Sequence, residues 1–154
     1  MSQDPHAPPL RGSLPPEGAE PSWGGPAAAP TVRIPLARIA HARSGDKADW
    51  VDFGLFAWNA AGYRLLEREV TADRVHSHFA PWLPGEVACW PLPRLLALKI
   101  VLQGALQGGG ARNLRLDNLG KSMAGALLRM EIEVTQVELD LALGTPRVGW
   151  WGDA

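Results

Sequence analysis

Apolar and polar residues alternate over residues 32–36, which is typical of a β-strand with one buried face. Pro35 places that strand at a sheet edge or at a bulge. Over residues 51–58 the odd-numbered and the even-numbered positions are both mainly apolar, so this stretch predicts a strand covered on both faces. Residues 86–92 predict a third strand, which prolines end.

Helical spacing covers residues 63–70, and Thr71 offers a hydroxyl N-cap for a second helix that ends at Pro81. Residues 94–107 are apolar around most of a helix circumference, which predicts a helix buried on more than one side. Its polar stripe consists of Lys99, Gln103 and Gln107. In a small domain, such burial indicates packing against the sheet and against a neighbouring chain.

The C-terminal part of the pattern is more ambiguous. Residues 113–117 alternate as a strand with Leu114 and Leu116 inward, whereas residues 121–134 fit either one helix or a helix followed by a strand. A last alternation over 137–141 is one residue out of phase, which indicates a bulge before it. This order predicts an α+β sandwich with one mainly antiparallel sheet and helices packed on one face.

Composition sets the domain boundaries. Residues 1–30 contain eight Pro, four Gly and five Ala, too little apolar surface to offset the entropy of ordering, so we expect a disordered tail. The 154-residue chain is 46% hydrophobic and has room for one packed domain, which we place at 31–143 with a C-terminal tail at 144–154.

Charge and cysteine content exclude several classes of function. The 15 basic and 16 acidic residues give a net charge of −1, which argues against nucleic-acid binding. The single Cys89 excludes an internal disulfide and an iron–sulfur cluster held by this chain alone. No stretch approaches the length of a membrane helix and the N-terminus lacks a secretory pattern, so we expect a cytoplasmic protein without membrane contact.

The densest polar cluster lies between the first strand and the buried one: His41, Arg43, Ser44, Gly45, Asp46 and Lys47. We expect residues 44–47 to form a loop that holds a carboxylate or the phosphates of a coenzyme A thioester. Catalysis is assigned to His41, Ser44, Asp46 and Lys47, and ligand binding to Arg43 and Gly45. The alternative is a solvated charged hairpin in which Asp46 and Lys47 pair loosely.

Two further segments are weaker candidates. Gly108, Gly109 and Gly110, followed by Arg112, offer backbone N–H groups to an anion, or else they only end a helix and reverse the chain. Lys121 and Ser122 after a glycine resemble the end of a phosphate-binding loop, but the full pattern is absent and an ordinary turn is the favoured interpretation. His76 and His78 are two residues apart, which does not suit a metal pair on a helix, so we expect no metal and no cofactor.

The 41–47 cluster, with Gly54 after it, resembles the opening of the ferredoxin-like domain found at the C-terminus of AtuA, the acyclic terpene utilisation family. The resemblance continues through residues 71–75, Gly85-Glu86-Val87, 102–106 and Gly120-Lys121, and it spans roughly 34–134. The family usually has Gly at the position of Ala48 and Asn at that of Asp52.

This resemblance implies a ferredoxin-like sandwich, here a stand-alone small domain. It further implies a subunit that pairs with a large AtuA-type protein in the catabolism of acyclic terpenes or related branched acyl-CoA or carboxylate compounds. We therefore expect a homo-oligomer or such a complex. The alternatives are a self-sufficient small hydratase or isomerase, and a homo-oligomeric ligand-binding module without catalysis.

Overall fold

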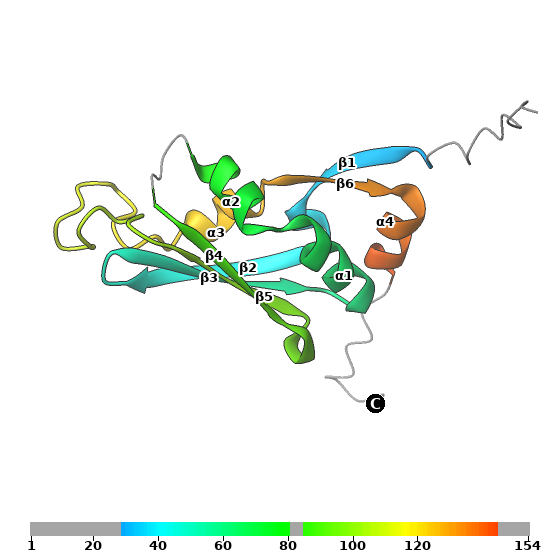
Figure 1. Cartoon of the computed structure of the whole chain (residues 1–154), viewed down its shortest axis with the longest axis horizontal. Helices are drawn as coiled ribbons and strands as arrows, with labels where there is room; N and C mark the ends of the chain where they lie inside the picture. The colour runs from blue at the N-terminus through cyan, green and yellow to red at the C-terminus, as the bar shows by residue number, and fades with distance from the viewer. Residues whose placement is uncertain (1–28, 81–84, 145–154) are drawn as a thin grey trace, which may run out of the picture.

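The computed structural model describes residues 29–80 and 85–144 (Figure 1). In chain order its elements are β1 (Thr31–Pro35), a 3-10 turn (Leu36–Arg38), β2 (Ala40–Lys47), β3 (Trp50–Ala57), α1 (Ala60–Glu69), α2 (Ala72–Phe79), β4 (Val87–Leu92), a second 3-10 turn (Pro93–Leu95), β5 (Ala97–Leu102), α3 (Met123–Leu127), β6 (Glu131–Thr135) and α4 (Gln136–Leu143).

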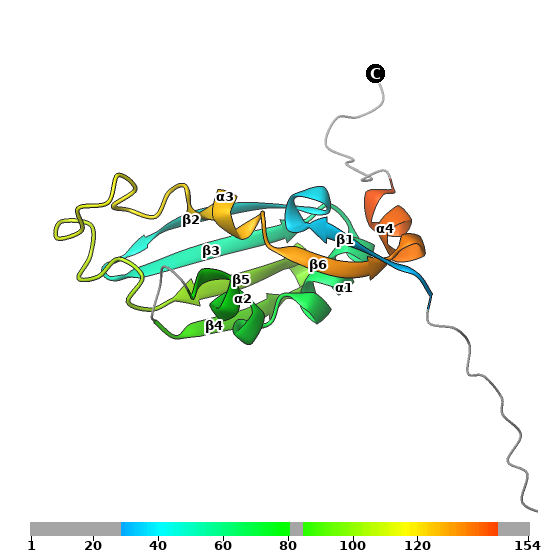
Figure 2. The same cartoon turned by 90° about the horizontal axis from the view of Figure 1, so that it is seen from above.

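The described strands form two antiparallel sheets. Four strands pair in the order β2-β3-β5-β4, and β1 pairs with β6 as a separate ribbon. Helices α1, α2 and α3 lie with this ribbon on one side of the four-stranded sheet (Figures 1 and 2). The α+β class and the antiparallel pairing are confirmed, although the strands are divided between two sheets.

The hydrophobic core lies between the four-stranded sheet and the helices. It takes alternate positions of the two central strands, each at most 3% exposed: Val51, Phe53, Leu55, Leu98, Ile100 and Leu102. The opposite face of β3, with Asp52, Gly54 and Phe56, is only partly buried. The prediction that residues 51–58 are covered on both faces is therefore wrong, because apolar side chains on the second face belong to an open surface.

Helices α1 and α2 confirm the expectations for residues 63–70 and for the segment after Thr71. The side chain of Asn59 accepts a hydrogen bond from the Gly62 backbone N–H at 2.8 Å, so the first helix begins earlier than predicted. Thr71 caps the second helix by accepting from the Arg74 N–H. That helix ends at Phe79, and the predicted stop at Pro81 lies outside the described residues.

The helix predicted over residues 94–107 is wrong. Residues 93–96 instead form a tight turn in which Leu96 has a φ of +50°, and β5 follows as a central strand of the sheet. A central strand is apolar on both parities, so periodicity alone does not separate it from a buried helix. The aliphatic and β-branched residues of 98–102 favour the strand once the preceding turn has joined it to β4.

Two predicted strands are also wrong. Residues 113–117 form an irregular loop in which Leu114 and Leu116 are fully exposed, and the side chain of Asn113 accepts from the Arg115 N–H in place of a ladder bond. Residues 137–141 belong to α4, which starts at a capping box rather than after a bulge. Residues 121–134 are a short helix followed by a strand.

The described part of the chain runs through α4 to Gly144. The tails predicted at 1–30 and 144–154 lie almost wholly outside the described residues and stay predictions. No helix among the described residues has both the length and the apolar character needed to cross a membrane.

The capping box of α4 carries a testable pH dependence. Hydrogen bonds from Arg68 and Thr135 lower the pKa of Glu138 from 4.5 to about 2. A carboxyl with a depressed folded-state pKa stabilises the fold above its unfolded pKa, and this contribution is lost as the pH falls from about 4.5 towards 2.

We therefore expect Glu138→Gln to lower the unfolding free energy at pH 7 and to flatten its fall between pH 5 and 2, measured by urea denaturation. Glu86→Gln is the matched control, because Glu86 is exposed and its side chain has no partner among the described residues. Identical pH profiles for the wild type and Glu138→Gln would contradict this account.

Candidate functional site

Residues 41–47 form a strand and not the predicted loop. Strand β2 pairs with β3 as far as Lys47 opposite Trp50, and the chain then reverses at Ala48 and Asp49. Ala48 has a φ of +55°, a conformation that glycine adopts more easily.

Strand geometry separates the polar side chains of this segment. Successive side chains point to opposite faces, so His41, Arg43 and Lys47 lie on the open face of the sheet. Ser44 and Asp46 lie on the face that packs against α3. Of the four residues predicted to be catalytic, Ser44, Asp46 and Lys47 nevertheless line one groove, whereas His41 does not line it.

Ser44 is held by the turn before α3. Its hydroxyl donates to the Gly120 carbonyl oxygen at 2.6 Å and accepts from the Ala124 backbone N–H at 2.9 Å. A nucleophilic serine needs a base within hydrogen-bond reach, whereas these partners are backbone groups and His41 points to the other face. In this arrangement Ser44 joins β2 to α3.

A groove of about 420 Å³ opens on the uncovered face of the sheet, beside β2. Its polar lining comprises Arg43, Ser44, Asp46, Lys47, Asp52, Lys99 and Lys121, and its apolar side comprises Phe56, Leu92, Leu95, Ala97 and Leu98, with Gly45 and Gly54 between them. Arg43 and Gly45, both predicted to bind ligand, lie in this groove together with Lys47.

Two ion pairs lie among the residues that line the groove. Lys121 donates to Asp46 at 3.2 Å, and this hydrogen bond lowers the pKa of that carboxyl. Lys99 pairs with Asp52. Gly45 makes room for this arrangement, because a Cβ there would lie 3.2 Å from the Lys121 Nζ.

Two cationic side chains of the groove have no partner among the described residues. Neither the Arg43 guanidinium nor the Lys47 ammonium has a hydrogen bond or an ion pair with any described residue. The carboxylates of Asp46 and Asp52 are already engaged by other lysines. The groove therefore carries an excess of positive charge that an anionic ligand would neutralise.

Several aromatic side chains lie on the same face of the sheet as the groove, and Phe56 lines it. His41 stacks on Phe56 with ring centroids 5.2 Å apart and also contacts Trp58. The register places Trp50 and Trp58 near opposite ends of β3 and Trp90 on the far strand β4. Each of the three tryptophans is 47–49% exposed, so this face presents large apolar area to its surroundings.

The glycine segment after β5 serves packing. Gly109 has a φ of +92°, and a Cβ there would lie 3.0 Å from the Ala48 carbonyl oxygen, so the loop rests directly on the β2–β3 hairpin. The Gly108 N–H donates to the Asp49 side chain at 2.8 Å, and the Gly110 carbonyl accepts from Asn118. The N–H groups of Gly108 and Gly109, which the sequence offered to an anion, are thus bonded to Asp49 and to the Leu106 carbonyl. Arg112 does not line the groove.

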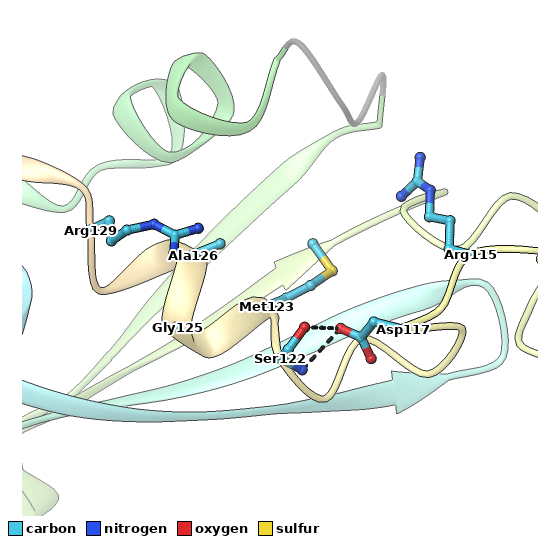
Figure 3. A pocket seen from close by; sticks show the side chains of 7 residues that line it. All are labelled: Arg115, Asp117, Ser122, Met123, Gly125, Ala126 and Arg129. Atoms are coloured by element: carbon cyan, nitrogen blue, oxygen red, sulfur yellow. Dashed lines mark hydrogen bonds between the residues drawn. The ribbon is translucent and has the colours of Figure 1, made fainter.

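A second pocket lies along α3 (Figure 3). The Asp117 carboxylate accepts hydrogen bonds from the Lys121 N–H at 2.7 Å and from the Ser122 N–H and hydroxyl at 2.9 and 2.7 Å. The place where a phosphate-binding loop would hold its anion is thus taken by Asp117. Segment 120–122 is an ordinary turn before a helix, as the favoured interpretation had it.

No group of three or more histidine, cysteine, aspartate or glutamate side chains in residues 29–80 and 85–144 is arranged to hold a metal ion. His78 contacts the Ala126 carbonyl at 2.9 Å through its Nε2 atom.

Sequence reasoning missed Asp52, Lys99 and Lys121 as groove residues. A signal existed for the first two, since each is a single charge within an apolar strand. Lys121 comes from the turn before α3, far along the chain, and no local pattern places it beside Gly45.

The comparisons with known proteins agree with the resemblance. The profile of the AtuA ferredoxin-like domain matches residues 34–133, which include the groove, most of the core and all the described strands except the start of β1 and the end of β6. Neither a curated protein nor a solved structure matches the chain. The chain belongs to the AtuA ferredoxin-like domain family.

Proposed function

We propose that this domain binds branched acyclic carboxylates, or acyl-CoA compounds derived from them, in the groove on the open face of its sheet. It does so as the small subunit of a complex with a large AtuA-type protein, in the catabolism of acyclic terpenes or related compounds. The observation that carries the proposal is a groove with two unpaired cations at its polar side and aliphatic side chains opposite.

The chemistry of the groove supports an amphipathic anion. Arg43 offers a planar guanidinium suited to bidentate contact with a carboxylate, and Lys47 adds a second positive charge on the same strand face. Phe56, Leu92 and Leu95 offer apolar contact to a hydrocarbon chain. A fully polar metabolite would leave this apolar side of the groove unused.

The open face supports a protein partner. Trp50, Trp58 and Trp90 are each about half exposed on or next to the strands of this sheet, and tryptophan and arginine are enriched among the residues that dominate binding energy at protein interfaces. A partner seated on these rings would cover a ligand in the groove and exclude water from it. In this proposal the partner supplies the reacting groups, since Ser44 is occupied by backbone hydrogen bonds.

Replacing Arg43 by Met should weaken carboxylate binding about 10- to 100-fold, because a hydrogen bond to a charged group contributes about 1.5–3 kcal/mol. The measurement is calorimetric titration of the purified chain with a branched acyclic carboxylate, and with the corresponding alcohol to isolate the contribution of the charge. Arg38→Met is the matched control, since Arg38 is exposed on the first 3-10 turn and does not line the groove.

If wild type and Arg43→Met bind the carboxylate with equal affinity, the ligand does not bind in the groove and the proposal is wrong. Turnover of the ligand by the purified chain alone would favour a self-sufficient hydratase or isomerase. Binding without turnover, and without any partner, would favour a ligand-binding module.

A further inference from the structure

We propose that Lys47 and Trp50 form a nucleotide subsite at the hairpin end of the groove, so that the natural ligand is a nucleotide-bearing thioester and the free acid fills only part of the site. Lys47 holds a phosphate and Trp50 stacks on the base. The inference rests on the proposed function, because it extends the same groove and decides between a carboxylate and its coenzyme A thioester.

The charge of the groove is the first observation. Its lining has a formal excess of two positive charges, from Arg43, Lys47, Lys99 and Lys121 against Asp46 and Asp52. A free monocarboxylate neutralises only one of these charges, whereas a phosphate monoester carries about −1.5 to −2 at pH 7. The charge of the groove therefore suits a phosphate-bearing ligand better than a simple acid.

The spacing of the two unpaired cations fits an extended ligand. Arg43 and Lys47 are four residues apart on β2, so their Cα atoms lie about 13 Å apart along the strand. Each cation can therefore hold a different part of one molecule. Lys47 holds the phosphate at the hairpin end, and Arg43 contacts the acyl end beside the apolar side chains of Leu92 and Leu95.

Trp50 is the second observation. It pairs with Lys47 across the hairpin, so both side chains lie on the open face with Cβ atoms about 4.5–5.5 Å apart. The indole is 47% exposed and has neither a hydrogen bond nor a ring contact with any residue in the described part of the chain. Proteins bind nucleotides by combining such an exposed ring for the base with a cation for the phosphate.

The hairpin holds this pair in a fixed position. Only Ala48 and Asp49 join β2 to β3, at the end of the sheet away from α1 (Figure 1). The Gly108 N–H donates to the Asp49 side chain at 2.8 Å, and the Leu106 N–H donates to the Asp49 carbonyl at 3.0 Å. Because the backbone under Lys47 and Trp50 is already ordered, binding costs less entropy.

The ligand class follows from both observations together. A dicarboxylate would balance the charge of the groove but would leave the indole of Trp50 unused. An uncharged aromatic compound would stack on the indole but would leave the ammonium of Lys47 without a partner. A nucleotide phosphate satisfies both side chains.

The test is calorimetric titration of the purified full chain with adenosine 3′,5′-bisphosphate. Adenosine is the uncharged probe, and glutarate is the dicarboxylate without a base. We expect the bisphosphate to bind at least 10-fold more tightly than either. Trp50→Ala should weaken its binding about 5-fold or more, from the loss of a stacked base. Lys47→Met should weaken it about 10-fold or more, from the loss of a charged hydrogen bond.

Trp58→Ala is the matched control. Trp58 is also 47% exposed, but it follows the opposite end of β3 and its ring contacts His41. We expect this variant to bind the bisphosphate as the wild type does. Melting curves show whether the variants fold, and Lys47→Met keeps the test decisive if Trp50→Ala does not fold.

The outcomes separate the subsite from the proposed function. If a branched carboxylate binds in a manner that depends on Arg43 and the bisphosphate does not bind, the proposed function stands and the subsite is wrong. Tighter binding of glutarate than of the bisphosphate, or unchanged affinity in Lys47→Met or in a folded Trp50→Ala, would also overturn the subsite. Binding of the bisphosphate without binding of the carboxylate would support the subsite and contradict the free-acid form of the proposed function.

Discussion

Replacing Ile100 by Ala should lower the unfolding free energy by about 2–5 kcal/mol, the range for removing a large aliphatic side chain from a packed core. Ile100 is 0% exposed on the central strand β5, opposite Phe53 on one neighbouring strand and Cys89 on the other. Urea denaturation monitored by circular dichroism measures the change.

Val101→Ala in the same strand is the matched control. Val101 is half-buried on the open face of the sheet, so we expect its truncation to lower the unfolding free energy by less than about 1.5 kcal/mol. Because neighbouring side chains of a strand lie on opposite faces, the losses of unfolding free energy at positions 100 and 101 should differ. Equal losses at 100 and 101 would fit the all-round burial of a helix and would contradict the placement of β5.

Replacing Trp90 by Ala should weaken binding to a large AtuA-type partner about 30-fold or more, since central interface residues contribute about 2–4 kcal/mol. Trp90 is 49% exposed on β4 and its indole makes no hydrogen bond with a described residue, so the fold does not depend on this side chain. The affinity is measured by surface plasmon resonance with the co-expressed partner.

Val137→Ser controls for a general loss of exposed apolar surface, because Val137 is 69% exposed on α4, outside the open face. We expect partner binding to survive this change. Loss of binding in Val137→Ser with retention in Trp90→Ala would place the interface on α4 instead of the open face of the sheet.

Local signals in the sequence were enough to predict the parts of the fold that are decided locally. Thr71 caps a helix with its own side chain, as predicted. The helix predicted over 63–70 is present, although its cap at Asn59 makes it begin at Ala60. The α+β class followed from the order of such elements. The prediction of a helix over 94–107 was wrong because a central strand and a buried helix share one apolar pattern. Only the hairpin at 93–96 decides between them.

For the candidate site, the sequence indicated which residues carry the chemistry but not how they are arranged. The chemistry of residues 41–47 is visible in the sequence, but the face on which each side chain lies depends on the pairing of β2 with β3. That pairing extends the strand to Lys47 and so divides Arg43 and Lys47 from Ser44 and Asp46. Lys121 enters the groove from a distant turn, and such long-range juxtaposition leaves no local trace in the sequence.

The central claim is that the groove on the open face binds a branched carboxylate, and an NMR titration of the uniformly ¹⁵N-labelled chain tests it most directly. On addition of the ligand, the amide signals of Gly45 and Gly54, which lie in the groove, should shift progressively and saturably. The amide signal of Gly144, at the end of α4, should stay in place. Shifts confined to residues outside the groove, or no saturable shift of Gly45 and Gly54, would contradict the account.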